Sequence, residues 1–546
     1  MDGLQASHPP CAVSYGLPDV FERVFQQLGP KEWAACSLSC RTFYNIVSSS
    51  RFFFPGSRLE LRQDAANKDS SELHSLALRR LERVGKALHS ATLAGASCSS
   101  AVLVRLPSLR SLHLREPLSP PDWAQLASLP HLRSLVLEGV QQLGGLLAMR
   151  ACTSLKTVTV AITLQHQLPP CPDSTAQLAQ GLPGLAAITQ LVLQLPEWAE
   201  SLNEAVGTLP QLASLSVTTT HKPRQDHGSP GDSDGGSHAN RQGLPSVRPA
   251  CWAGNTQLTQ LILNLAGDCT PVLPGLSRLS ELRRLSVVGA GGRSPEDLFD
   301  GGGHYHLESL AVAGTGGLPT VPDYLEHSMP NLRALEASYG ALSAGLYPPQ
   351  LCLAQLISLD LYNAGLDNTE SCPTALPDAF SKITGLRQLS LAKNYLEVVP
   401  PSVCALTSLT FLSLWGNRLG GLPGGPYLAR LGYLNLASNC LTGLPGALAE
   451  AQQLQDLGLT SNPIEGWTQE DAKVLGRIGA RLRLLGFGGR AWERSREGQG
   501  RPGGCTGGGE AAPSRDLEVA LLWVAAREAP GCEVCFDASR FESRFA

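Results

Sequence analysis

Leucines recur along most of the chain in the order L-x-x-L-x-L, most clearly between residues 386 and 464. Four copies in this stretch begin 23, 22 and 23 residues apart, and an asparagine follows the third leucine of each copy by three residues. Alternate apolar positions over so short a segment predict a β-strand with one buried face. The copies open at Leu386, Leu409, Leu431 and Leu454, and their asparagines are Asn394, Asn417, Asn439 and Asn462.

Weaker copies extend this pattern and bring the total to sixteen, with most successive copies 21 to 25 residues apart. The asparagines are missing between Leu88 and Leu155, so leucine-rich helices remain an alternative explanation of the spacing there. The weaker copies open at Leu88, Leu109, Leu132, Leu155, Ile188, Leu212, Leu258, Leu282, Leu307, Leu332, Leu356 and Leu482.

The period and the pattern match the leucine-rich repeat. One repeat cannot bury its own leucines, whereas stacked neighbours can. The asparagine amides are suited to satisfy backbone groups at the turn that leaves each strand, which would form a ladder along the stack. We therefore predict an α/β solenoid, a leucine-rich-repeat horseshoe with a parallel concave β-sheet, preceded by a small three-helix head.

A polar run rich in glycine, serine and aspartate occupies residues 218–255 and cannot bury enough apolar surface to order itself. It is either a disordered loop or a degenerate repeat, and the gap of two periods between Leu212 and Leu258 slightly favours the second. Ser229 and Ser233 within it are candidates for phosphorylation. We expect residues 1–14 to be disordered, 15–54 to form the head, 55–488 the solenoid with a disordered insert at 218–250, 489–514 a flexible linker, and 515–546 a helical tail or cap.

The head is predicted from an apolar stripe at helical spacing that begins after Asp19 and ends at Gly29-Pro30. Pro30 can start a second helix, and a third is expected from about Cys40 to Ser48. About forty residues in three short helices lie near the limit of independent stability. One face of this head is therefore expected to dock on another structure.

This segment resembles the F-box, the motif that binds the Skp-type adaptor of SCF ubiquitin ligases. The resemblance is carried by Leu17-Pro18, by the helix V-F-E-R-V-F-Q-Q-L and by the later S-L-S-C-R-T-F-Y-N-I-V. The alternative is a helical cap that covers the open end of the solenoid. By the resemblance, the residues that face or support the adaptor groove are Leu17, Pro18, Val24, Phe25, Leu28, Leu38, Cys40 and Phe43.

Composition narrows the classes of function. The chain has 43 Lys and Arg against 47 Asp and Glu, and charged residues make up 16%, below the roughly one quarter usual for globular proteins. This balance disfavours nucleic-acid and membrane-surface binding, and the fifteen cysteines are too dilute for a disulfide scaffold. With no secretory signal and no long apolar run, we expect a cytoplasmic or nuclear protein, with the cytoskeleton or ciliary axoneme as the alternative.

Signatures of catalysis are missing from the sequence. No phosphate-binding loop, zinc-protease motif or nucleophile elbow is present. Cys532 and Cys535 form a single C-x-x-C pair, whereas zinc requires four ligands, so we interpret the pair as chance or a weak redox pair. We expect no enzyme activity, no catalytic residues, no metal and no cofactor.

Binding is instead expected at the variable positions of the concave strands, because the leucines are committed to the core. Phe411, Trp415 and Tyr433, with Tyr362 nearby, have the composition of an exposed interface hot spot. The alternative is that some of these aromatic rings pack against a neighbouring loop or the carboxyl-terminal helix. The predicted face comprises Asp360, Tyr362, Asn363, Arg387, Gln388, Ser390, Lys393, Phe411, Ser413, Trp415, Tyr433, Asn435, Ser438, Gln455, Asp456 and Thr460.

The resemblance to F-box/leucine-rich-repeat proteins implies a non-enzymatic adaptor that recruits a protein substrate to an SCF-type cullin ligase. Its partners would be the Skp-type adaptor, the cullin ligase core and an unidentified protein substrate, with no nucleic acid and no membrane. The rival interpretation is a leucine-rich-repeat scaffold, cytoskeletal, axonemal or associated with small GTPases, whose amino-terminal helices only cap the solenoid.

Overall fold

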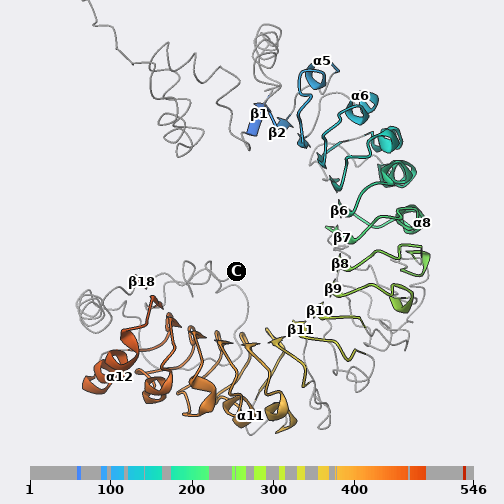
Figure 1. Ribbon diagram of the computed structural model, residues 1–546. Coiled ribbons are helices and arrows are strands. Elements are labelled where there is room, and N and C mark those ends of the chain that lie inside the picture. The colour runs from blue at the N-terminus through green and yellow to red at the C-terminus, as the bar shows by residue number, and fades with distance from the viewer. Residues whose placement is uncertain are drawn as a thin grey trace, which may run out of the picture. The chain divides into compact units, whose positions relative to one another are not determined.

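The computed structural model describes residues 58–62, 88–94, 100–115, 121–140, 142–162, 174–220, 249–252, 254–265, 276–289, 306–313, 329–338, 354–367, 376, 378–464, 468–486 and 533–535. They fall into two compact units, Met1–Gln194 and Leu195–Ala546. Each unit has a leucine-rich-repeat solenoid fold, in which parallel strands form one layer and short helices the other (Figure 1).

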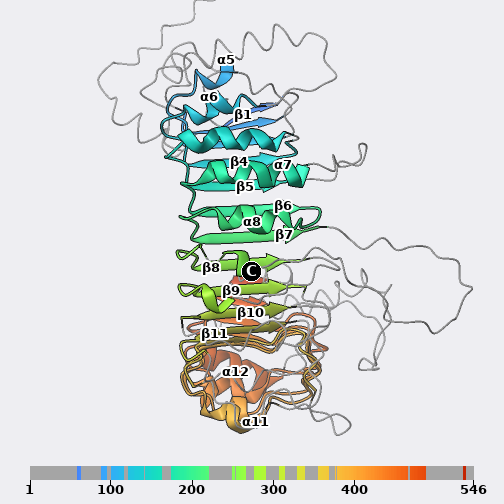
Figure 2. The same ribbon diagram turned by 90° about the vertical axis from the view of Figure 1, so that its right-hand side faces the viewer.

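The first unit contains strands paired in parallel and in sequence order, as Figure 2 shows for β4 and β5. Its strands are β1 (Arg58–Arg62), β2 (Ser90–Ala94), β3 (Ser111–Arg115), β4 (Ser134–Glu138), β5 (Thr157–Ala161) and, except for its last residue, β6 (Gln190–Leu195). Its helical connections are α5 (Ser100–Leu103), α6 (Trp123–Ala127), α7 (Ser174–Gly181) and the 3-10 helices η2 (Leu143–Ala151) and η3 (Leu182–Leu185).

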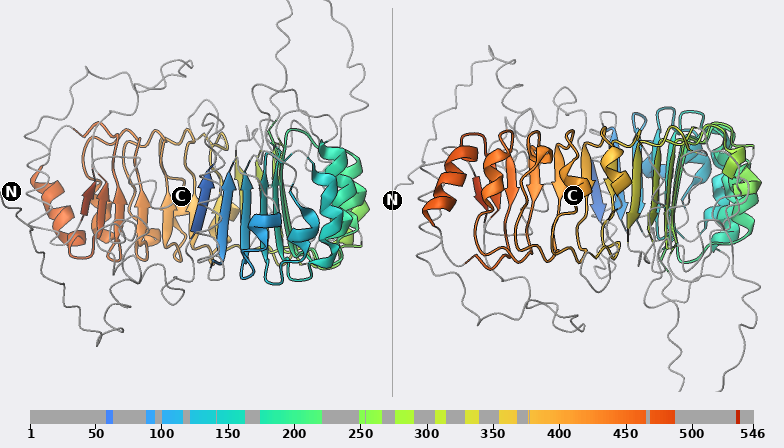
Figure 3. Two further views of the ribbon diagram at one scale, coloured as in Figure 1. Left: turned by 90° about the horizontal axis from the view of Figure 1, so that it is seen from above. Right: turned by 90° about the horizontal axis from the view of Figure 1, so that it is seen from below.

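The second unit repeats this arrangement, and Figure 3 shows its strands pointing the same way. Its strands are β7 (Ser214–Thr219), β8 (Gln260–Asn264), β9 (Arg284–Val288), β10 (Ser309–Ala313), β11 (Ala334–Ser338), β12 (Ser358–Asp360), β13 (Gln388–Ser390), β14 (Phe411–Ser413), β15 (Tyr433–Asn435), β16 (Asp456–Gly458), β17 (Leu484–Gly486) and β18 (Glu533–Cys535). Its helices are α8 (Ser201–Gly207), α11 (Pro401–Cys404), α12 (Gln469–Gly479) and the 3-10 helices η4 (Pro249–Trp252), η5 (Leu276–Arg278), η6 (Asp378–Lys382), η7 (Pro426–Leu428) and η8 (Gly446–Glu450).

The leucine pattern locates the strands. Each of the sixteen predicted copies opens two residues before a strand, from β2 to β17. The copies between Leu88 and Leu155 also lead into strands, so the helical alternative for that stretch is wrong. Strands β1 and β18 were not predicted, and β18 contains Cys535 of the C-x-x-C pair.

The predicted asparagine ladder is confirmed in the second unit. The side chain of Asn394 donates to the carbonyls of Leu361 and Leu391 at 2.9 and 2.8 Å, and its Oδ1 accepts from the amide of Leu366 at 3.0 Å. Asn417, Asn439 and Asn462 make equivalent bonds in the following repeats. Each buried amide therefore joins its own turn to that of the preceding repeat, which holds the strands in register.

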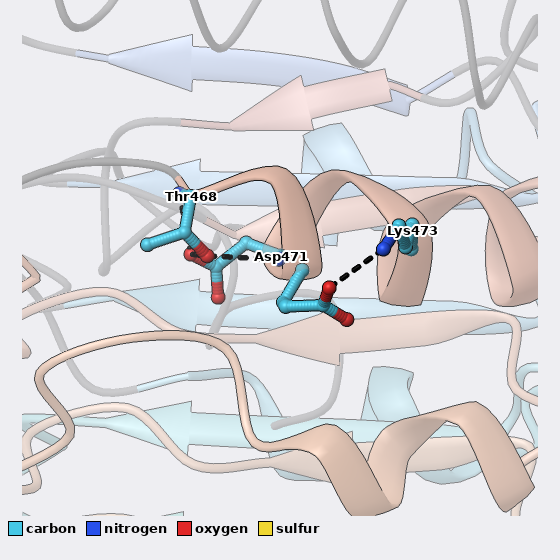
Figure 4. Close-up of polar contacts among 4 residues, drawn as sticks. Thr468, Asp471 and Lys473 are labelled. Atoms are coloured by element: carbon cyan, nitrogen blue, oxygen red, sulfur yellow. Dashed lines mark hydrogen bonds and ion pairs between the residues drawn. The ribbon is translucent and has the colours of Figure 1, made fainter.

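Helix α12 has a capping box at its amino-terminal end (Figure 4). The Asp471 amide donates to the Thr468 hydroxyl at 3.2 Å, while Asp471 Oδ2 accepts from the Thr468 amide at 2.7 Å. Asp471 Oδ1 also accepts from the amide of Leu444 in the preceding repeat at 2.7 Å. The buried Asp471 carboxylate thus caps the amino-terminal end of α12 and links this helix to the preceding repeat.

The polar run at 218–255 is shorter than the sequence suggested. Thr218 and Thr219 belong to β7, and residues 249–252 form η4 at its other end. Trp252 is fully buried there, and its Nε1 donates to the carbonyl of Asn203 at 3.0 Å. The end of the run therefore supplies the helical layer of a repeat, while residues 221–248, with Ser229 and Ser233, lie outside the described residues.

The head predicted at 15–54 lies outside the described residues, and so does the tail predicted at 515–546 except for residues 533–535. Among the helices that the structure describes, none is both long and apolar enough to span a membrane.

Candidate functional site

The candidate site lies on the side of the sheet opposite the buried leucines, from β12 to β16. The middle leucines of these strands, such as Leu389 and Leu412, are fully buried, so their neighbours along the strand lie on the other side. The register places Asp360 beside Ser390, and Phe411 beside Tyr433. We call this surface, formed by the first and third residues of β12–β16 and the turns that follow them, the strand face.

Two aromatic pairs occupy the strand face. The rings of Phe411 and Tyr433 are stacked, with centroids 4.3 Å apart and planes 3° from parallel. Those of Tyr362 and Trp415 are also stacked, at 6.2 Å and 27°. Phe411 opens β14, whereas Trp415 lies in the turn beyond the last residue of that strand, Ser413. The single cluster expected from the sequence is therefore two separate pairs.

Lys393 covers the second pair. Its Nζ lies 4.3 Å from the centroid of the Trp415 ring, which is a cation–π contact. A Cβ at Gly416 would lie 2.9 Å from Lys393 Cδ and would shift this lysine side chain. Lys393, Trp415 and Tyr362 thus form one ordered group from three consecutive repeats.

Several predicted site residues belong to the turns that leave the strands. Asn363, Lys393 and Ser438 have φ values of 50°, 57° and 54°, and Gly416 at the same repeat position has 68°. Their amides donate to the next repeat, as from Lys393 to the carbonyl of Trp415. The left-handed backbone at this position is thus a requirement of the repeat, independent of what its side chains bind.

Acidic groups lie where the strand face borders β11. Asp360 and Glu336 are paired in register on β12 and β11. Burial raises the pKa of the Asp360 carboxyl, and hydrogen bonds from Ser390 and the amide of Tyr362 partly oppose that increase. Asp360 Oδ1 accepts from the Tyr362 amide at 3.0 Å, so this carboxylate fixes the start of the turn that carries the Tyr362 ring.

Four of the residues predicted to contact a partner are buried, so the prediction that they are accessible is wrong for these four. Tyr433 is only 7% exposed and packs with Phe411 and Leu484 in a small apolar cluster. Asn435 uses its Oδ1 to accept from the amide of Ala437 at 3.0 Å, a structural role. Ser413 and Thr460 are buried as well. Tyr433 therefore packs against side chains of strands β14 and β17, whereas the alternative considered from the sequence was a loop or the carboxyl-terminal helix.

The other predicted residues of the strand face are accessible to different degrees. Arg387 and Gln388 are exposed, and Gln388 Oε1 accepts from the Ser358 hydroxyl at 3.3 Å. The remaining ones are half-buried: Asp360, Tyr362, Asn363, Ser390, Lys393, Phe411, Trp415, Ser438, Gln455 and Asp456.

Sequence reasoning missed three features of this surface. Gly416 lies beside the Lys393 side chain. Glycine occurs at this turn position in several repeats, and this pattern could have indicated the feature from the sequence. The Arg418 guanidinium lies 5.0 Å from the exposed Tyr395 ring, and Leu484 closes the apolar cluster. Both contacts join residues of different repeats, so they become visible only when the repeats are aligned.

A charged cluster in the first unit was also missed. Glu138 on β4 accepts from Nε2 of His113 at 3.1 Å and lies 3.4 Å from Nε of Arg115 on β3. The register that pairs Arg115 with Glu138 accounts for the cluster. The residues predicted to contact the adaptor lie outside the described residues: Leu17, Pro18, Val24, Phe25, Leu28, Leu38, Cys40 and Phe43.

Comparison with known protein families identifies two segments. The F-box domain model matches residues 16–55, and the leucine-rich-repeat model matches residues 407–464, which contain β14 to β16 and three rungs of the asparagine ladder. These families are generally non-enzymatic interaction modules, and the matches indicate no catalytic family. A search of curated proteins finds no match to the chain.

Solved structures similar to this chain include a leucine-rich-repeat protein of Leptospira interrogans, at 17% identity and a TM-score of 0.44, covering 85% of this chain and 98% of that one. Another is the Toll–Spätzle complex of Drosophila, at 17% identity and 0.48, covering 79% and 55%. Listeria monocytogenes InlP is similar at 23% identity and 0.31, covering 40% and 62%. The chain thus combines an F-box segment with leucine-rich repeats, which is consistent with an F-box/leucine-rich-repeat protein.

Proposed function

We propose that this protein is a substrate-recruiting subunit of an SCF-type cullin ubiquitin ligase. The observation that carries the proposal is the presence, in one chain, of an F-box match at residues 16–55 and a repeat solenoid with an ordered strand face. F-box domains typically bind a Skp-type adaptor, so the head would attach the chain to the ligase core. The repeats would then hold the recruited protein.

Such a subunit performs no covalent chemistry. It raises the effective concentration of the target near the ubiquitin-transfer machinery, which accelerates transfer without a new catalytic group. The required properties are one surface for the adaptor and another for the target.

The group of Tyr362, Lys393 and Trp415 is the part of the strand face best suited to anchor a target. Tyrosine and tryptophan are enriched at protein-binding hot spots. The stacking of Tyr362 on Trp415 and the contact with Lys393 hold these side chains in place before binding. Less side-chain entropy would therefore be lost when a partner binds.

Attachment to the ligase is tested by a pull-down with a purified Skp-type adaptor. The intact chain is compared with a Leu17→Ala/Pro18→Ala/Phe25→Ala variant and with a matched Glu22→Ala/Gln26→Ala/Gln27→Ala control in the same predicted helix. We expect the adaptor to bind the intact chain and the control, and to lose binding to the first variant. Absence of binding to the intact chain would exclude the ligase function and favour a plain repeat scaffold.

Target binding is tested in cells whose cullin ligases are inhibited, so that bound targets accumulate. A Tyr362→Ala/Trp415→Ala variant should lose these proteins and keep the adaptor, whereas the head variant should keep them and lose the adaptor. A variant of Arg418, on the neighbouring contact with Tyr395, serves as the matched surface control. Targets that remain bound to the Tyr362/Trp415 variant at native levels would exclude this group as the anchor.

A further inference from the structure

Three cations occupy one position in consecutive repeats of the first unit. Arg110, Arg133 and Lys156 each directly precede a strand, and all three are exposed. Their backbones are in register, since the Arg133 amide donates to the carbonyl of Arg110 and the Lys156 amide to that of Arg133, both at 2.8 Å. Neighbouring strands lie about 4.8 Å apart, so these residues form a compact row. We call Arg110, Arg133 and Lys156 the basic row.

The cations of the basic row have no acidic partner among the described residues. Among the residues that the structure describes, none of the three takes part in an ion pair, and the Lys156 ammonium donates only to the carbonyl of Ala187, at 3.4 Å. Like charges directly opposite on neighbouring strands repel and lower stability. Glu138, an acid on β4, is already held by His113 and Arg115.

In the second unit, the position directly before each strand carries charges of alternating sign in three consecutive repeats. There the consecutive residues are Arg283, Glu308 and Arg333, again with backbones in register. Glu308 separates the two arginines and lies 3.1 Å from Nη1 of Arg283. The repeat therefore accommodates alternating charge at this position, and the three consecutive cations of the first unit are not imposed by the fold.

A row of hydroxyl groups lies beside the basic row. Ser111, Ser134 and Thr157 directly follow the three cations, open β3, β4 and β5, and are paired in register. They are half-buried and lie at the edge of the sheet that the cations occupy. Each of three successive strands therefore begins with a hydroxyl residue directly after a cation, and both are donors that bind oxyanions.

The charge of the surrounding repeats supports an anionic ligand. Residues 1–194 contain 17 Lys and Arg against 13 Asp and Glu, whereas residues 195–546 contain 26 against 34. The positive charge is thus concentrated in the first unit, where it can steer an anionic partner.

We propose that the basic row binds a phosphorylated segment of the recruited protein, an inference that rests on the proposed function and names the class of its target. A phosphoserine carries about −1.5 to −2 charges and three strong acceptor oxygens, so one phosphate can bridge two neighbouring cations. Side chains on one face of an extended peptide repeat every ~6.6 Å, which is wider than the spacing of ~4.8 Å between strands. Successive carboxylates therefore match the row less well than one phosphate does.

The proposal is tested by fluorescence anisotropy on the full chain. The probes are short labelled peptides with a central phosphoserine in a degenerate background, together with the same mixtures carrying serine or glutamate. An Arg110→Gln/Arg133→Gln/Lys156→Gln variant is compared with an Arg283→Gln/Arg333→Gln/Arg483→Gln control, which removes the same charge at the same repeat position. We expect the first variant to lose at least about tenfold in affinity for the phosphoserine mixture, and the control less than about twofold.

A single change tests the charge argument separately. Arg133→Glu creates in the first unit the alternation seen at Arg283, Glu308 and Arg333. We expect this variant to lose phosphopeptide binding while its Tm stays at or above the native value, which separates loss of binding from loss of folding.

Three outcomes would overturn the proposal. The intact chain could bind the serine mixture as tightly as the phosphoserine mixture, or it could bind the glutamate mixture as tightly as the phosphoserine mixture. The basic-row variant and the control could also lose the same affinity for the phosphoserine mixture. The adaptor pull-down distinguishes this failure from failure of the proposed function, because the basic row lies outside the F-box match. Phosphopeptide binding without adaptor binding would contradict the ligase function alone.

Discussion

Lys393 lies over the indole ring of Trp415, with Nζ 4.3 Å from the ring centroid, although the two residues belong to different repeats. The Trp415 carbonyl accepts a hydrogen bond from the Lys393 amide at 2.6 Å, so backbone and side chain join the same two turns. The absence of a side chain at Gly416 allows the lysine to lie across this turn.

Gly416→Ala is therefore expected to destabilise the protein by about 1–2 kcal/mol, because alanine is strained at φ 68° and its Cβ displaces Lys393. Urea unfolding measures the loss. Gly420→Ala is the matched control, since a Cβ there has nothing within 4 Å. Equal effects of the two substitutions would show that the cost reflects helix or loop propensity alone and not the contact with Lys393.

Asn439→Ala should cost about 2–4 kcal/mol, because it leaves buried backbone groups of two repeats without partners. Its Nδ2 donates to the carbonyls of Leu414 and Leu436, both at 3.0 Å, and its Oδ1 accepts from the Leu419 amide at 3.0 Å. Asn439→Asp should cost more, since it removes both donors and buries a charge. Gln388→Ala, at an exposed position, should change the unfolding free energy by less than about 0.5 kcal/mol.

Two substitutions at the start of α12 should have clearly different costs. Thr468→Ala removes one cap and should cost about 1 kcal/mol. Asp471→Ala should cost about 2–3 kcal/mol, because it also leaves the Leu444 amide without its acceptor. Lys473→Ala removes only the exposed pair with Glu470 seen in Figure 4 and should cost less than about 0.5 kcal/mol. Thermal and urea unfolding of the three variants provide the measurement, and an Asp471 variant no worse than the Thr468 variant would contradict the link between repeats.

Asp360 gives a prediction for pH. Burial raises the pKa of its carboxyl above the ordinary value of 3.8, so the folded chain binds this proton more tightly than the unfolded chain. The contribution of Asp360 to stability therefore falls as pH rises from about 3.8 through the folded-state pKa. Asp360→Asn, which retains an oxygen to accept from the Tyr362 amide, should raise Tm at pH 7 and lose this advantage near pH 4. A variant whose Tm is lower than the native value at pH 7 would show that the charge is favourable in the folded protein.

The repeat fold was determined by the sequence alone. Strand formation depends on alternation within a few residues, and the asparagine ladder depends on a fixed offset from the leucines, so both are visible locally. All sixteen predicted copies lead into strands, and the ladder from Asn394 to Asn462 follows. The two strands that were not predicted, β1 and β18, lack this pattern over a full repeat. They are recognised only by their pairing with β2 and β17.

The tertiary structure alone decided which residues of the strand face meet and which are accessible. Phe411 stacks on Tyr433, and Trp415 contacts Tyr362 and Lys393, because strand register brings together residues from different repeats. Tyr433 is buried because Leu484, two repeats further on, lies on the same side. The members of the basic row recur every 23 residues, and strand register then brings their backbones side by side. The local periodicity of the leucines determines how the repeats stack. The surface chemistry depends instead on side chains from different repeats, which become neighbours only when the strands are aligned.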